Sequence, residues 1–150
     1  MKRSKGLLVV ALLMLAGGVW GQDCAVSTVP VQFGQYISID PLPVDAVGNV
    51  KVTCGAGTPF MIKLDPGESP AKSFHPREMR SATGGAALGY NLFRNVSRTE
   101  VWGDGTNSTF AQPGVGRGVE ELFPVYGRIP GRQNVGVGFF RDSITVTVEW

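Results

Sequence analysis

Few residues of this 150-residue chain have the types and spacing that chemistry requires. Its two cysteines, Cys24 and Cys54, could form a disulfide, hold a metal ion together or bridge to another molecule. The metal and intermolecular interpretations are weaker, because no Cys-x-x-Cys motif is present and His75 is the only histidine. An intramolecular disulfide is favoured. It would close a loop of about thirty residues and stabilise the fold by about 3 kcal/mol.

Catalytic motifs find little support in the sequence. Glu120 and Glu121 are adjacent carboxylates, but neighbouring residues of a strand point to opposite faces and cannot act as a dyad. The glycine run at Gly114, Gly116 and Gly118 lacks the lysine and the strand-to-helix context of a phosphate-binding loop. The chain is therefore predicted not to be an enzyme, with no cofactor and no metal. A carbohydrate-active enzyme with distant carboxylates is the weaker alternative.

The segments of the chain that position these residues show the alternation of polar and apolar residues that is typical of β-strands. The last eight residues alternate polar and apolar without a break, which places Ile144, Val146, Val148 and Trp150 on one buried face. Leu88–Arg94 alternates in the same way, with Tyr90 and Leu92 on one face. Further strands are predicted at 25–33, 49–54, 60–64, 77–80 and 122–129, with glycine-rich connections at 110–118 and 131–138.

These segments are short, are separated by glycine and proline, and show no amphipathic helical period. The pattern predicts one all-β domain, and a sandwich is favoured over a barrel. The chain ends inside a predicted strand. That strand is therefore either an ordinary edge strand or one whose outer neighbour is supplied by a partner.

The N-terminal residues 1–21 have the layout of a secretory signal peptide. A basic start is followed by the uncharged apolar run Gly6–Val19, and Val19 and Gly21 supply small residues before a cleavage site. A membrane anchor is the alternative, but a span needs about 20 apolar residues. The predicted mature domain, 22–150, keeps eleven basic and twelve acidic residues. Its net charge of −1 suggests neither nucleic acid nor a membrane surface as partner.

Several motifs of the mature chain, taken in order, resemble the spore coat protein U domain family. They are Phe33-Gly34-Gln35-Tyr36, Val50–Cys54, Leu88–Phe93, Val101–Thr106, Val125–Pro130, Gln133, Gly138–Asp142 and the terminal strand Ile144–Trp150. Proteins of this family include subunits of archaic chaperone–usher pili, which serve attachment and biofilm formation, and components of myxobacterial spore coats.

The resemblance implies an immunoglobulin-like β-sandwich that lacks its last strand. A periplasmic chaperone would first fill the resulting groove, and the N-terminal extension of a neighbouring pilus subunit would replace it at an outer-membrane usher. The groove or chaperone contact is then expected at Ile144, Val146, Val148, Trp150, Tyr90 and Leu92. The protein would pass through the periplasm to the cell surface, or be secreted into a coat, without a membrane span after cleavage.

One feature differs from what is expected of a pilus subunit that polymerises, which needs a donor strand before its first cysteine. If cleavage follows Gly21, only Gln22 and Asp23 precede Cys24, which is too short for a donor strand. The expectation is a subunit that accepts a strand without donating one, at a tip or a terminus. The alternative is a self-contained secreted coat or surface-binding domain that does not polymerise.

Overall fold

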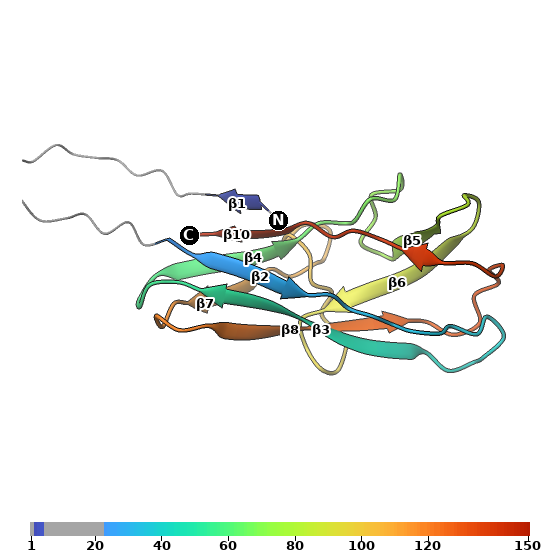
Figure 1. The fold of residues 1–150 in the computed structure, drawn as a ribbon, viewed down its shortest axis with the longest axis horizontal. Helices are drawn as coiled ribbons and strands as arrows, with labels where there is room; N and C mark the ends of the chain where they lie inside the picture. The colour runs from blue at the N-terminus through green and yellow to red at the C-terminus, as the bar shows by residue number, and fades with distance from the viewer. Residues whose placement is uncertain (1, 5–22) are drawn as a thin grey trace, which may run out of the picture.

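The fold is known from a computed structural model, which describes residues 2–4 and 23–150. These residues form ten strands and no helix, arranged as two sheets that pack face to face (Figure 1). The all-β prediction is therefore confirmed. The predicted signal peptide lies outside the described residues except for Lys2–Ser4, so its removal and the boundary at Gln22 stay predictions.

The two sheets differ in size. The smaller sheet has the order β1 (Lys2–Ser4), β10 (Val146–Glu149), β4 (Pro59–Leu64) and β7 (Gln112–Val115). The larger sheet has the order β2 (Ala25–Val29), β3 (Val44–Thr53), β8 (Glu121–Ile129), β6 (Ala87–Phe93), β5 (Arg77–Ser81) and β9 (Phe140–Arg141). The pairs inside the larger sheet are antiparallel, whereas β1 lies parallel to β10.

Alternation along the strands builds the core between the sheets. Val50 and Val52 of β3 face inward opposite Ile62 of β4 and Val148 of β10, and all four are at most 1% exposed. Trp102 is equally buried, and its indole Nε1 donates a hydrogen bond to the Ile62 carbonyl at 3.1 Å. The period-two patterns read from the sequence therefore identify the inward faces correctly.

Strand boundaries differ from the prediction in four places. β3 begins at Val44, before the strand expected at 49–54. The strand expected at 25–33 ends at Val29, because Pro30 has no N–H for the ladder. The glycine-rich segment 110–118, expected as a connection, contains β7. The C-terminal strand, expected over the last eight residues, covers only Val146–Glu149, and the short strand Phe140–Arg141, which pairs with β5, was not predicted.

The predicted disulfide is confirmed. Cys24 and Cys54 are bonded, with their Cα atoms 4.3 Å apart and 30 positions between them in sequence. The bond fixes the start of β2 to the end of β3. Within residues 2–4 and 23–150, no helix has the length and apolar character needed to cross a membrane.

Candidate functional site

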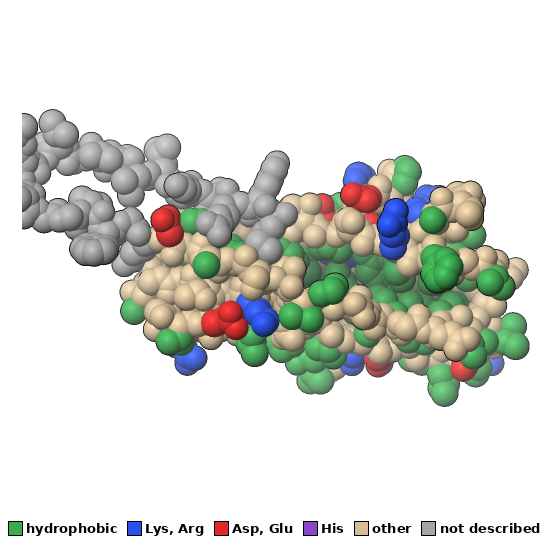
Figure 2. Space-filling model, viewed as in Figure 1, with side chains coloured by type: hydrophobic (Ala, Val, Ile, Leu, Met, Phe, Trp, Pro, Cys, Tyr) green, Lys and Arg blue, Asp and Glu red, His purple; other side chains and the backbone are tan. Residues whose placement is uncertain are grey.

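The described residues enclose an apolar groove of about 800 Å³. Figure 2 shows it as a hollow in the surface, with hydrophobic side chains inside it and along its rim. Its walls are two stretches of chain far apart in sequence. We call residues 28–38 the first lip and residues 135–146 the second lip.

The first lip is the chain that continues from β2. After Val29 it leaves the ladder with β3, and residues 30–36 have no regular secondary structure. Val31 and Phe33 turn toward the core, and the Phe33 ring meets the Tyr90 ring edge-on with centroids 6.0 Å apart. The disulfide at Cys24 anchors this lip one residue before β2 begins.

The second lip contains β9 and the start of β10, which belong to different sheets. Between them, Thr145 is fixed by Asp65: the Thr145 N–H donates to Asp65 Oδ1 at 3.0 Å, and the Thr145 carbonyl accepts from the Asp65 N–H at 3.1 Å. The second lip therefore crosses from the larger sheet to the smaller sheet at Thr145, a point fixed by these two bonds. β2 and β9 are the two edge strands of the larger sheet, and no described strand lies between the two lips.

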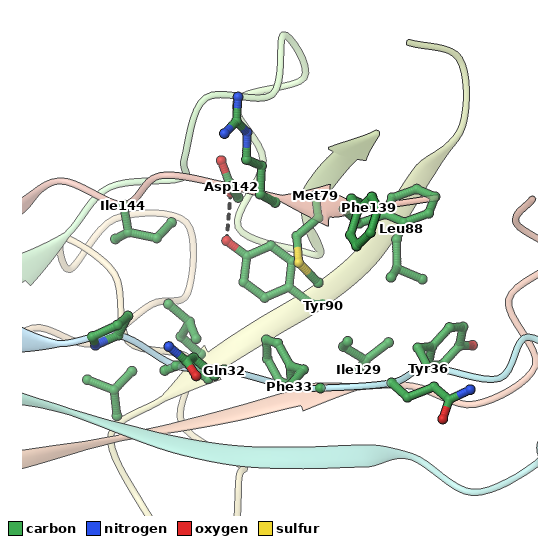
Figure 3. A pocket seen from close by; sticks show the side chains of 18 of the residues that line it. Gln32, Phe33, Tyr36, Met79, Leu88, Tyr90, Ile129, Phe139, Asp142 and Ile144 are labelled. Atoms are coloured by element: carbon green, nitrogen blue, oxygen red, sulfur yellow. Dashed lines mark hydrogen bonds between the residues drawn. The ribbon is translucent and has the colours of Figure 1, made fainter. Parts of the chain in front are cut away.

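The floor of the groove comes mainly from β6 and its neighbours. Leu88, Tyr90 and Leu92 alternate toward it, and Met79 of β5 and Ile129 of β8 complete it (Figure 3). Each of these five side chains is at most 7% exposed. The floor is therefore formed mainly by buried apolar side chains.

One polar contact crosses the groove. The Tyr90 hydroxyl donates to Asp142 Oδ2 at 2.6 Å, drawn as the dashed line in Figure 3, and Asp142 Oδ1 accepts from the Glu68 N–H at 2.8 Å. Burial, together with the hydrogen bond to Asp142, raises the pKa of Tyr90 above its usual value. The phenol thus stays protonated and holds the second lip to the floor.

A buried arginine supports the same region from behind. Arg77 is 0% exposed, and its guanidinium donates to the Asp65 carbonyl at 3.0 and 2.8 Å and to the Trp102 carbonyl at 2.7 Å. It also donates to Asn91 Oδ1 at 3.0 Å. Burial lowers the pKa of Arg77 to about 10, so it remains charged at neutral pH. Because Asp65 in turn binds Thr145, Arg77 helps to position the second lip.

Four of the six residues predicted for the groove line it: Tyr90, Leu92, Ile144 and Val146. The other two do not. Val148 is fully buried opposite Ile62 of β4, and Trp150 is half-buried at the end of the chain and packs against the core. The role of all six in binding a partner stays a prediction.

Sequence reasoning missed the first lip and part of the second. Val31 and Phe33 were predicted as the end of the strand 25–33, but nothing in the sequence marked them as residues that line a groove. Val135 and Phe140 lie in or next to a segment expected to be a glycine-rich connection. Arg77 gave no sequence signal at all, since its acceptors are distant in sequence.

Residues 2–4 and 23–150 contain no group of three or more histidine, cysteine, aspartate or glutamate side chains that could hold a metal ion. The only histidine, His75, uses its Nε2 for a 2.7 Å hydrogen bond with the Asn107 carbonyl.

The fold and groove define an immunoglobulin-like β-sandwich with an open apolar edge region. Comparison with known proteins makes the assignment specific. The chain belongs to the Spore Coat Protein U domain family, whose model matches residues 11–147. It is 31% identical to Protein U of Myxococcus xanthus over 130 residues, which is 79% of this chain and 70% of that protein.

A solved structure supports the fold. The chain is similar, with a TM-score of 0.62 and 23% identity, to a chain in the crystal structure of the CsuC–CsuE chaperone–tip adhesion subunit pre-assembly complex from archaic chaperone–usher Csu pili of Acinetobacter baumannii. The match covers 86% of this chain but only 40% of that chain. A weaker likeness, with a TM-score of 0.44 and 13% identity, is to the E. coli Hda pilus minor tip subunit HdaB.

Proposed function

We propose that this protein is an exported structural subunit of a surface fibre of the archaic chaperone–usher type, and that its groove accepts a β-strand from a partner. The observation that carries the proposal is the apolar groove between two lips with no described strand between them. An added strand would pair with the lips through its main chain. Its alternate side chains would cover Leu88, Tyr90 and Leu92.

The edge of β10 supports the same proposal. Lys2–Ser4 pair with it in parallel register, Lys2 opposite Thr147 and Ser4 opposite Glu149. This edge therefore has the geometry to take up another strand. If residues 1–21 are removed on export, Lys2–Ser4 leave with them, and a partner can occupy the edge and continue into the groove.

The proposed partners are a periplasmic chaperone, an outer-membrane usher and neighbouring pilus subunits. The fold of this chain resembles a chain of a chaperone–pilus subunit complex, and it is a member of the Spore Coat Protein U domain family. The proposed route is through the periplasm to the cell surface, with adhesion and biofilm formation as the biological role. This role requires no catalysis.

The proposed position in the fibre is at a tip or terminus. Cleavage after Gly21 would leave Gln22 and Asp23 before the disulfide-bonded Cys24. Two residues extend less than about 7 Å and cannot fill a groove of this size. N-terminal sequencing of the exported protein tests the proposed cleavage site. A mature N-terminus ten or more residues before Cys24 would contradict the proposed position at a tip or terminus.

A second function has one observation in its favour. The 31% identity to Protein U and the spore-coat family are equally compatible with a secreted coat or surface-binding domain that does not polymerise. In that case the groove would stay empty or be covered within a coat, and no chaperone would be needed.

Co-expression in the periplasm with the chaperone encoded beside the gene separates the two functions. A stoichiometric complex that stabilises the subunit is expected. Ile144→Asp, on the second lip, should abolish the complex, whereas Ile39→Asp, at a position that is 85% exposed, should not. A wild-type chain that is stable alone and ignores the chaperone would establish the second function instead.

A further inference from the structure

An acidic side chain lies in the otherwise apolar middle of the groove. Among the described residues, Asp142 is the one aspartate or glutamate that lines the groove, and it alternates along the second lip with Ile144 and Val146. In Figure 3, Asp142 lies between Ile144 and Phe139 along the groove, beside the floor residue Tyr90. Asp142 is therefore on the path that the proposed function assigns to a strand.

The carboxylate belongs to a chain of contacts that crosses the groove from one lip to the other. The Phe33 ring of the first lip meets the Tyr90 ring edge-on, with centroids 6.0 Å apart. The Tyr90 hydroxyl then donates to Asp142 Oδ2 at 2.6 Å. We call these three side chains the crossbar. All three line the groove, so a strand between the lips must pass over them.

The hydrogen bonds of Asp142 leave room for one more donor. Its Oδ1 accepts from the Glu68 N–H at 2.8 Å and from the Ser143 N–H at 2.9 Å, and its Oδ2 accepts from the Tyr90 hydroxyl. An ionised carboxylate can accept about four hydrogen bonds, two at each oxygen. The described residues therefore leave one acceptor position of Oδ2 to water or to a partner.

The charge of Asp142 has no direct counterion in the described part of the chain, where none of the ion pairs includes it. Arg77, which lies behind the second lip, directs its guanidinium to the Asp65 and Trp102 carbonyls and to Asn91. Asp142 is half-buried, so water can reach it in the open groove. A strand over the crossbar displaces that water, and an anion in apolar surroundings then needs another donor.

We propose that the accepted strand carries a hydroxyl side chain, threonine or serine, at its inward position over the crossbar, and that this hydroxyl donates to Asp142 Oδ2. The inference rests on the proposed function. The neighbouring inward positions of the strand face Leu88 and Leu92 of the floor and stay apolar. The single hydroxyl fixes the register, because a shift by two residues would bury it against apolar side chains and leave the carboxylate without its donor.

The test uses the mature chain extended after Trp150 by an Asn-Gly turn and a strand of about eleven residues, with valine inward and threonine outward. The turn returns the strand antiparallel to β10, so its first residue lies opposite Trp150, its fifth opposite Val146 and its ninth opposite Asp142. Valine is then replaced at the fifth or the ninth position by threonine, which has nearly the same shape and adds a hydroxyl. Urea unfolding measures the equilibrium constant of folding.

At the fifth position, threonine should lower the equilibrium constant of folding about tenfold, because its hydroxyl is buried against apolar side chains. At the ninth position, threonine should raise this constant about three- to tenfold over valine, through its bond to the carboxylate. In Asp142→Ala this gain should become a loss like that at the fifth position. Asp104→Ala removes a carboxylate outside the groove, which also accepts a hydroxyl and an N–H hydrogen bond, and should keep the gain.

Tyr90→Phe keeps the ring of the crossbar and removes its phenol donor, so the gain at the ninth position should be equal or larger. No gain in the wild type, a gain that survives in Asp142→Ala, or loss of the gain in Tyr90→Phe would overturn the hydroxyl requirement while leaving strand acceptance intact. If the strand with valine at every inward position does not stabilise the wild type, strand acceptance itself is wrong, and the hydroxyl requirement with it.

Discussion

The two flanks of the sandwich are held together by different kinds of bond. On the closed flank, β3 and β8 pair without interruption from Val44 opposite Ile129 to Val52 opposite Glu121, and β2 covers the other edge of β3. On the open flank, the first and second lips face each other across the groove, and side chains do most of the linking. Arg77 and Asp142 each bind backbone groups there.

The difference explains how an open edge keeps its shape. A backbone ladder stabilises both of its strands, but it leaves no room for another. Side-chain bonds to carbonyl and N–H groups fix the lips at their ends and from behind, so the groove between them stays accessible. The open flank should therefore be more sensitive to the loss of single polar side chains than the closed flank.

The largest effect is expected for Arg77→Ala. The change removes the buried donor of the Asp65 and Trp102 carbonyls, leaves Asn91 Oδ1 with only the Leu92 N–H, and creates a cavity. A loss of about 3–5 kcal/mol in the free energy of unfolding is expected. Urea unfolding measures this loss. The exposed Arg117→Ala is the matched control, and its free energy of unfolding should stay within about 0.5 kcal/mol of the wild-type value. A loss below about 1 kcal/mol would show that these bonds do not hold the open flank.

The disulfide gives the next largest effect. Replacing Cys24 and Cys54 with serine removes a cross-link over 30 positions, and a loss of about 3 kcal/mol is expected from the greater freedom of the unfolded chain. Because Cys24 anchors the first lip, amide exchange should also rise across residues 25–38. Faster exchange spread evenly over both flanks would contradict a local role for this bond.

Val52→Ala and Val125→Ala compare the flanks directly. Both residues lie on paired strands, but Val52 is fully enclosed on the closed flank, while Val125 faces the groove. In the isolated subunit we expect a loss of about 2 kcal/mol for Val52→Ala and about 1 kcal/mol for Val125→Ala, since the groove offers fewer contacts to lose. Filling the groove with an appended strand should remove the difference. Equal losses before the strand is added would mean that the groove is already filled.

The sequence predicted the two flanks unequally well. Period-two alternation identified Tyr90 and Leu92 of the floor and Ile144 and Val146 of the second lip, because local pattern alone sets which face of a strand is buried. Alternation alone did not show that Val148 packs in the closed core opposite Ile62, whereas Val146 lines the groove.

The side-chain bonds of the open flank were beyond sequence reasoning. Arg77 binds groups at positions 65, 91 and 102, and Asp142 binds Glu68 and Tyr90, so each contact depends on the tertiary arrangement. Alternation carries no information on such pairs.

The smallest effect is expected on the closed flank, at Asp45. The hydrogen bonds from Arg128, at 2.7 and 2.9 Å, lower the pKa of Asp45 below its ordinary value, and the pair is largely exposed. Asp45→Asn should lower the free energy of unfolding by about 0.5 kcal/mol at neutral pH. Because the pKa is depressed in the folded state, this contribution is present above the ordinary pKa of 3.8 and disappears as the pH falls through the folded value.

Urea unfolding of the wild type and Asp45→Asn at neutral and strongly acidic pH measures this contribution, with the exposed Asp23→Asn as control. A difference that persists unchanged after Asp45 is protonated would mean that the ion pair is not its source. A difference of several kcal/mol at neutral pH would contradict the comparison itself. The closed flank would then depend on single side chains as strongly as the open one, although its continuous β3–β8 ladder remains when the ion pair is removed.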